Sequence, residues 1–355
     1  MTATALKTAF STWSATGQPL VLATVYDTEG STYSKTGAHM LITGEATFQG
    51  MLSGGCLEGD LAERARQVVD TGQPQAVTYD LGTNDEELWG LGVGCDGLMR
   101  ILLQPLLADE GYEPFQTIVT ALDGETTELA ATVVESNIDT LPVGSSLVTV
   151  NGKVAFSNIG SGVQDDIWQK VRGAFADPRS RTMAYTSEQG GVKILLGALT
   201  PPPKVLVLGA GLDAAPVVRF ALELGWRVTI QDHRPAYIES GDFSAADNVL
   251  CVPVEALSST IDLGQFDAVI VMSHHLVSDR QYLAQLADTA IDYIGLLGPV
   301  DRRRRLLRDL GEKGKQLEGR VHGPAGLAIG GRGPAAIALS IIAEMHQQLM
   351  VPLRG

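Results

Sequence analysis

Residues 204–232, KVLVLGAGLDAAPVVRFALELGWRVTIQD, decide the fold of the second half of the chain. An apolar run at 205–208 leads into the glycine turn 209–214, and apolar residues at helical spacing follow up to Gly225. A second apolar run then ends at Asp232. This order of strand, G-x-G-x-x-A turn, helix and strand is typical of the first unit of a doubly wound sheet. The stretch therefore predicts a Rossmann-like doubly wound parallel sheet domain over residues 201–355, which begins at a stiff proline linker.

The same stretch offers a candidate nucleotide site. In a dinucleotide-binding turn, glycines such as Gly209 and Gly211 let the backbone approach a pyrophosphate, and an acidic residue such as Asp232 contacts the ribose. NAD(P) is accordingly one candidate cofactor. Asp213 opposes this interpretation, because it brings a negative charge into the turn where the pyrophosphate would lie. The pattern predicts the fold and leaves the ligand open.

Two further segments carry polar side chains where ligands bind in such sheets. His274 follows an apolar run, at the carboxyl end of a predicted strand. Gly330 and Arg332 precede a helix that begins at Pro334, in a glycine-rich turn whose N–H groups can face an anion. Ordinary surface loops are the alternative for both segments. The arginine run 302–305 is interpreted as a solvated helix face or a docking point for an acidic partner.

The first half of the chain contains an internal repeat. The stretch from Leu22, LATVYDTEGSTYSKTGAHMLITGEATFQGMLSGGCLEGDLAERA, aligns with the stretch from Ala130, AATVVESNIDTLPVGSSLVTVNGKVAFSNIGSGVQDDIWQKV. Glycines match at a constant spacing, and both copies have the pattern of strands, turns and a final helix. Chance similarity in a chain rich in glycine and valine is the alternative. We predict two related mixed α/β units at residues 1–108 and 109–200, the second of them degenerate.

Two cysteines with glycine neighbours lie in the first copy. Gly54, Gly55 and Cys56 come directly before a predicted helix, whose N-terminus can stabilise a thiolate. Gly94 and Cys95 lie in the glycine-dense stretch LWGLGVGCDG, whose backbone N–H groups can approach an anion or a cofactor. Cys56 is either such an activated thiol or a small packed residue. The second copy has valine at the matching position, which favours a chemical role for the thiol.

The composition excludes several classes of function. The 355 residues carry a formal net charge of -15, which disfavours nucleic acid and anionic membrane surfaces as partners. The sequence has no apolar run long enough to span a membrane, no signal-peptide pattern and no zinc-binding motif, so no metal site is predicted. The three cysteines do not form a disulfide framework. We expect a cytoplasmic protein that binds a small molecule or another protein.

Taken together, these segments resemble the XdhC/CoxI family of accessory factors for molybdenum hydroxylases such as xanthine dehydrogenase. The matching motifs are GSTYSKTGAHMLI, SGGCLEGDLAERA, GVGCDG, the stretch 201–237, the S-H-x-x-x-x-D segment at 273–279 and GPAGLAIGGRGPAAIALSIIAEM. The resemblance implies a homodimer that binds molybdenum cofactor, a molybdopterin, and is not itself a turnover enzyme. It also implies that a cysteine desulfurase sulfurates the bound cofactor and that a client hydroxylase receives it. Of the two cysteines, it associates Cys95 most with the cofactor, with Cys56 as its neighbour.

The sequence departs from the family pattern at Asp96, Leu212, Ala335 and Ala336. These departures suggest a divergent member with an altered ligand or client, or a regulator that has kept only the fold. The competing interpretation is an NAD(P)-dependent oxidoreductase that uses one of the two cysteines as a nucleophile or redox group. The charge of Asp213 and the lack of an acid–base constellation weigh against it, so no catalytic residue is assigned.

Overall fold

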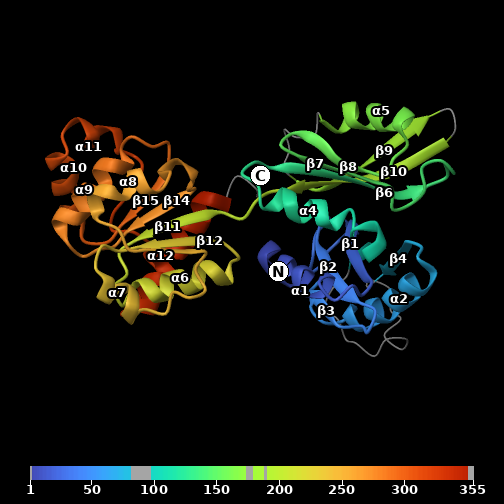
Figure 1. Ribbon diagram of the computed structural model, residues 1–355, viewed down its shortest axis with the longest axis horizontal. Coiled ribbons are helices and arrows are strands. Elements are labelled where there is room, and N and C mark those ends of the chain that lie inside the picture. Colours follow the sequence, from blue (N-terminus) through green and yellow to red (C-terminus); the bar gives the residue numbers. More distant parts are fainter. Residues whose placement is uncertain (1, 81–96, 173–178, 188–189, 351–355) are drawn as a thin grey trace. The chain divides into compact units, whose positions relative to one another are not determined.

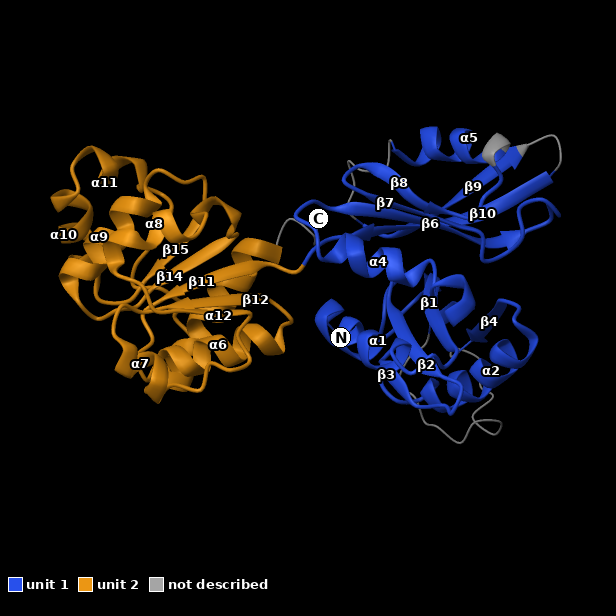
Figure 2. Cartoon of the chain, viewed as in Figure 1, with its two compact units in different colours: residues 1–201 blue, residues 202–355 orange. Residues whose placement is uncertain are grey.

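The proline linker divides the chain into two units, residues 1–201 and 202–355, which Figure 2 colours separately. The computed structural model describes residues 2–80, 97–172, 179–187 and 190–350 (Figure 1). Each unit contains its own sheets and its own apolar cores.

The first unit contains two five-stranded sheets that are built in the same order. Their strand orders are β3-β2-β1-β5-β4 and β8-β7-β6-β10-β9, and all neighbouring strands are antiparallel. The first copy consists of α1 (Ala3–Ser14), β1 (Leu20–Glu29), β2 (His39–Thr43), β3 (Phe48–Gly50), α2 (Glu58–Thr71), β4 (Gln75–Asp80) and β5 (Leu98–Leu106). After the short helix η1 (Ala108–Glu110), the second copy consists of α4 (Phe115–Leu122), β6 (Glu128–Ser136), β7 (Ser146–Val150), β8 (Lys153–Ser157), α5 (Ser161–Arg172), β9 (Arg181–Ser187) and β10 (Gly190–Leu199). The predicted duplication of the mixed α/β unit is confirmed.

The strand register matches the two copies residue by residue. Thr24 pairs with His39 across β1 and β2, and Thr132 pairs with Ser146 across β6 and β7. These pairs occupy equivalent places in the two sheets, in agreement with the alignment of the two stretches.

Two equivalent glycines lie where the two copies pack against each other. Gly37 and Gly144 have φ values of +92° and +91°, which favour glycine. A Cβ atom on Gly37 would lie 2.2 Å from the Oγ atom of Ser180, and one on Gly144 would lie 2.7 Å from the Cγ atom of Pro74. Each glycine thus admits the residue that precedes the fourth strand of the other copy, as expected for two copies related by approximate twofold symmetry.

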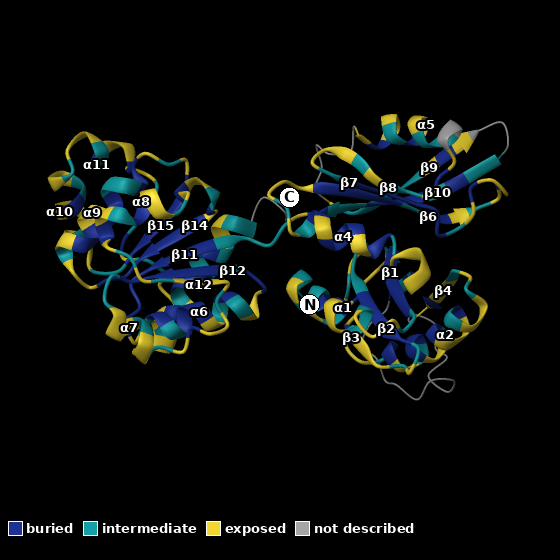
Figure 3. Cartoon of the chain, viewed as in Figure 1, coloured by how far each residue is buried: buried dark blue, intermediate teal, exposed yellow. Residues whose placement is uncertain are grey.

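A shared apolar core lies between the two sheets of the first unit. Leu6 and Phe10 of α1 and Phe115 and Ile118 of α4 are buried there with strand residues from both copies. Helix α2 covers the other face of the first sheet, and α5 covers the other face of the second. Figure 3 shows the buried strands between these helices.

The second unit contains the predicted doubly wound parallel sheet. Its strand order is β13-β12-β11-β14-β15-β16, and every neighbouring pair is parallel. The strands are β11 (Lys204–Leu208), β12 (Arg227–Gln231), β13 (Asn248–Leu250), β14 (Ala268–Val271), β15 (Tyr293–Leu296) and β16 (Val321–His322). Helices α6 (Ala214–Glu223) and α12 (Pro334–Met350) pack on one face, and α8 (Leu257–Thr260), α9 (Leu276–Leu286) and α10 (Val300–Asp309) pack on the other. The remaining helices are α7 (Pro235–Ser240), η3 (Val254–Ala256), η4 (Leu263–Gln265) and α11 (Glu312–Gln316).

None of the helices within the described ranges combines the length and apolar character that a membrane crossing needs.

Candidate functional site

The glycine turn after β11 is shaped by the neighbouring strand. Gly209 has a φ value of +119°, and a Cβ atom there would lie 2.6 Å from the carbonyl carbon of Met272, just beyond β14. Glycine is the residue that accepts both conditions without strain. Gly209 is therefore required by the packing of the strands, independently of any ligand.

Asp232 is fully buried just after β12, and its carboxylate already has protein partners. Its Oδ2 atom accepts hydrogen bonds of 2.8 Å from the Ala210 N–H and from Nη2 of Arg234. Its Oδ1 atom accepts bonds of 2.9 Å from the backbone N–H and Nε of Arg234. Burial raises the pKa of Asp232, but the bonds from Arg234 and Ala210 outweigh it and keep the pKa below its ordinary value. A ribose could bind this carboxylate only by displacing the guanidinium.

His274 and Asp213 form a hydrogen-bond contact across the glycine turn. The Nε2 atom of His274 lies 2.6 Å from Oδ2 of Asp213, and the His274 side chain is 57% exposed. His274 has a φ value of +58°, an uncommon conformation for a non-glycine residue. A Cβ atom on Gly211 would lie 2.9 Å from Oδ1 of Asp213, so the missing side chain leaves room for this carboxylate. The acidic residue in the turn thus orients an accessible imidazole.

A second buried carboxylate lies further along the same edge of the sheet. Asp279 accepts a hydrogen bond of 2.5 Å from Ser273 Oγ and one of 2.6 Å from Nη2 of Arg302. The Nε atom of Arg302 is buried and has no hydrogen-bond partner among the described residues. The interpretation of the arginine run as a solvated face is wrong for Arg302, whose side chain is 23% exposed, although it fits the 73% exposed Arg304.

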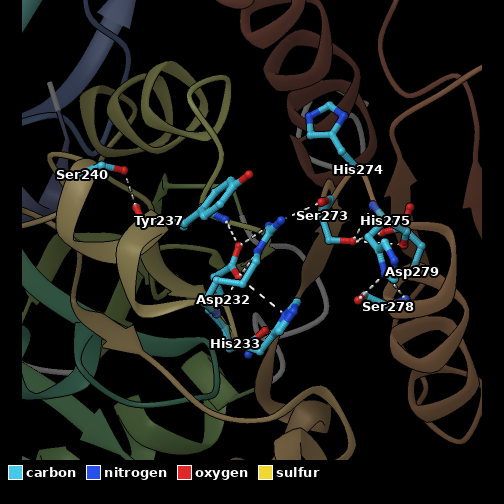
Figure 4. Close-up of polar contacts among 12 residues, drawn as sticks. Asp232, His233, Tyr237, Ser240, Ser273, His274, His275, Ser278 and Asp279 are labelled. Carbon is cyan, nitrogen blue, oxygen red and sulfur yellow. Dashed lines mark hydrogen bonds and ion pairs between the residues drawn. The ribbon is translucent and has the colours of Figure 1, made fainter.

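The carboxyl edge of the parallel sheet therefore gathers five of the predicted residues, and Figure 4 shows part of this polar edge. They are Gly209, Gly211, Asp213, Asp232 and His274. Sequence reasoning missed Arg234 and did not place Arg302 beside Asp279. The D-x-R spacing is a signal for the first, whereas only the fold brings the second to Asp279.

Gly330 and Arg332 lie in the loop between β16 and α12, and both are exposed. Helix α12 begins at Pro334, as predicted. The loop is anchored to this helix, because the Leu327 N–H donates to the carbonyl oxygen of Ser340 at 3.1 Å. It presents an exposed guanidinium beside a helix N-terminus, a suitable group for an anion.

The glycine turn before α2 has a ligand from the protein itself. Glu58 is 3% exposed, and its carboxylate accepts hydrogen bonds from the N–H groups of Leu52, Ser53 and Gly55 at 2.8–2.9 Å. The hydroxyl of Ser53 donates to the same carboxylate at 2.5 Å. Burial raises the pKa of Glu58, but the bonds from Ser53 and Leu52 outweigh it and keep the pKa low. These backbone donors are therefore occupied by an internal anion.

Cys56 lies just before Leu57, the N-cap residue of α2, at the predicted position. Its side chain is half-buried and packs against the core of the first sheet. Gly54 lies under the ring of Tyr33, whose Cδ2 atom would be 3.3 Å from a Cβ there.

Gly94 and Cys95 lie outside the described residues, together with Asp96. The described Gly97 follows them, and a Cβ atom on it would lie 2.5 Å from the carbonyl oxygen of Ser31. Gly97 therefore lies beside the connection between β1 and β2.

Two family models match the chain. The model of the XdhC Rossmann domain matches residues 205–345, and that of the XdhC and CoxI family matches residues 13–80. The first match covers the parallel sheet, and the second ends at the last residue of β4.

Individual relatives extend the similarity over the whole chain. A probable xanthine dehydrogenase subunit of Bacillus subtilis is 30% identical over 92% of this chain and 92% of its own length. The crystal structure of a xanthine dehydrogenase from Bacillus halodurans has a TM-score of 0.79 at 29% identity, covering 99% of this chain and 96% of that one. The "Uncharacterized protein YqeB" of Escherichia coli is 27% identical over 48% of this chain and 32% of its own length.

Proposed function

The chain belongs to the XdhC and CoxI family, and on this basis we propose that it is an accessory factor that binds molybdenum cofactor. It supports sulfuration of the bound cofactor by a cysteine desulfurase and delivers the cofactor to a xanthine dehydrogenase-type molybdenum hydroxylase. The similarity to a probable xanthine dehydrogenase subunit over nearly the whole chain supports this role.

The observation that supports a role for the segment containing Cys95 is the unequal length of the connections in two matching strand pairs. Strands β9 and β10 of the second copy are joined by residues 188–189. The equivalent β4 and β5 are joined by residues 81–97, which include Gly94 and Cys95. Since a strand pair of this kind needs only two connecting residues, the longer segment is available for function.

The donor set of the chain suits the chemistry of this cofactor. Molybdopterin combines a phosphate, a dithiolene and a polar pterin, which call for cationic groups, soft thiols and hydrogen-bonding side chains. Cys95 and Cys56 supply thiols in the first unit; in the second unit, Arg332 supplies an exposed guanidinium suited to a phosphate, and His274 supplies an exposed imidazole for hydrogen bonding. The turn at Gly54 and Gly55 contributes less than the sequence suggests, because Glu58 occupies three of its N–H groups.

An NAD(P)-dependent oxidoreductase is the weaker candidate. It rests on the glycine turn 209–214, where Gly209 is already explained by strand packing. Asp232, the residue expected to bind ribose, has both carboxylate oxygens bonded to Arg234. Asp213 keeps a carboxylate in the region that a pyrophosphate would occupy.

The direct test is a retention experiment with the full chain. The protein is incubated separately with molybdenum cofactor and with NADH, and unbound ligand is removed by gel filtration. Retained cofactor is then measured as the fluorescent oxidation product of its pterin. The proposal predicts stoichiometric pterin and no NADH, whereas NADH retention without pterin would support the oxidoreductase. A cytoplasmic location and a homodimer belong to the same proposal, and sedimentation of the loaded protein tests the dimer.

A further inference from the structure

The two copies in the first unit differ at one pair of equivalent positions in their interface. In the register of the sheets, Gln104 of β5 lies opposite Leu22, and Gly197 of β10 lies opposite Ala130, the residue aligned with Leu22. The Gln104 side chain crosses to the second copy, where its Nε2 donates to the carbonyl oxygen of Gly144 at 2.8 Å. Gly197 has no side chain to make the equivalent contact with the first copy.

The missing side chain coincides with a pocket of about 320 Å³. Gly197 lines the pocket, and a Cβ atom there would make ordinary van der Waals contacts, the nearest at 3.9 Å, so a side chain can be added at this position without a clash at its Cβ. Leu22 and Phe115 are among the apolar residues that line the pocket, and His39 and Thr132 are among the polar ones. The pocket therefore lies between the two sheets of the first unit, at a place where the approximate twofold symmetry is broken.

His39 gives the pocket an uncharged hydrogen-bonding group. Its Nδ1 atom lies 3.0 Å from Oγ1 of Thr24, which fixes the ring. Burial lowers the pKa of His39 to about 4, so the imidazole is neutral at physiological pH. A neutral imidazole offers one donor and one acceptor nitrogen.

The pocket lining, as far as the structure describes it, offers no unpaired charge to a ligand. Of the described lining residues, Lys7 is the one with a permanent charge, and its ammonium group pairs with Asp123. An ionic ligand would therefore lose its hydration without gaining a free counter-ion. The volume lies near the lower end of the range for small-molecule sites, about 300–1,000 Å³.

We propose that this pocket is a binding site for a compact, uncharged heteroaromatic molecule of one or two rings, held between the apolar walls and hydrogen-bonded to His39. The site goes beyond the cofactor role, because it lies in the interface of the repeat and uses neither cysteine. Ligand binding there would stabilise the contact between the two copies by mass action.

The experiment uses indole as a neutral probe and indole-3-acetate as its charged counterpart, observed by saturation-transfer NMR with the full chain. Gly197→Gln restores the residue type of the equivalent position and fills the pocket. Gly191→Gln is the matched control, because Gly191 lies in the same strand outside the pocket lining, and a Cβ there meets its nearest neighbour at 3.8 Å. The ring nitrogens of His39, labelled with ¹⁵N, report contact in the unmodified protein.

We expect saturable transfer to indole, a shift of the His39 ring signals and binding of indole-3-acetate that is weaker by about tenfold or more, equivalent to about 1.4 kcal/mol. G197Q should abolish the transfer, and G191Q should preserve it. Indole that binds G197Q as it binds the wild type, or a His39 signal that does not move at saturating indole, would overturn the proposal. The His39 signal decides the matter even if G197Q does not fold, and neither result depends on cofactor retention.

Discussion

At the scale of single residues, two buried carboxylates, Glu58 and Asp232, already have their hydrogen-bond partners within the protein. Glu58 accepts the N–H groups of the turn that the sequence suggested for a ligand, and Asp232 accepts the guanidinium of Arg234. The equivalent of Glu58 in the second copy is Asp165, which is exposed. The first copy therefore has an internally stabilised turn directly before Cys56, which the described residues of the second copy lack at the matching position.

Replacing Glu58 tests whether its carboxylate holds this turn. Glu58→Gln removes the charge from a buried group with four donors, and we expect a local loss of about 2 kcal/mol. Hydrogen exchange of the peptide 51–58, measured by mass spectrometry, should accelerate by roughly 30-fold at pH 7. Glu63→Gln on the same helix is the control, because the side chain of Glu63 is 65% exposed. Equal exchange in both variants would contradict this role.

The effect of Glu58→Gln on hydrogen exchange should depend on pH. Since the pKa of Glu58 is lowered from 4.5, its stabilisation is complete above that value and is lost as the pH falls through the folded-state pKa. The difference in exchange between wild type and E58Q should therefore be constant from pH 7 to about pH 5 and shrink under more acidic conditions. A difference that grows with acidification would show that another group stabilises the turn.

At the scale of elements, the glycine turn after β11 is set by its neighbour strand. The sequence pattern predicts strand, turn and helix there, and all three are confirmed. The pattern cannot distinguish a glycine that lets the backbone approach a pyrophosphate from one that lets it pack against the backbone of Met272, because both require close approach without a Cβ.

Two alanine substitutions separate the glycines of this turn. Gly209→Ala adds a Cβ against the Met272 backbone at a positive φ, and we expect a loss of about 3 kcal/mol or more. Gly211→Ala crowds the Asp213 side chain at 2.9 Å and makes an ordinary contact with His274 at 3.8 Å; since the Asp213 side chain can move, about 1 kcal/mol is expected. Urea unfolding, monitored by hydrogen exchange of β11 and α6, measures the stability loss of each variant. A larger loss for G211A than for G209A would refute this explanation.

The connection between β4 and β5 can be shortened to match the second copy. Replacing residues 81–97 with Asn-Gly joins the paired residues Asp80 and Leu98 by a two-residue turn. We expect the circular dichroism spectrum to be retained and cofactor retention to be lost. Full cofactor retention by the shortened protein would remove this segment from the site.

At the scale of the whole molecule, the sequence predicts the architecture and only part of the site. The repeat and the parallel sheet follow from glycine spacing and apolar patterning, which depend on local geometry. The ion pair of Asp279 with Arg302 and the pocket beside Gly197 depend on segments that only tertiary folding brings together. The sequence alone does not distinguish Gly197 from other strand glycines; the strand register shows that its place in the second sheet is equivalent to that of Gln104 in the first.

Our main proposal is that the chain binds molybdenum cofactor through Cys95. The decisive experiment measures pterin retained per chain after gel filtration, for wild type, Cys95→Ala and Cys251→Ala, where Cys251 is an exposed cysteine of the second unit. We predict stoichiometric retention by wild type and C251A and a decrease of about tenfold or more in C95A. Equal retention by C95A and wild type, or retention by neither, would contradict the proposal.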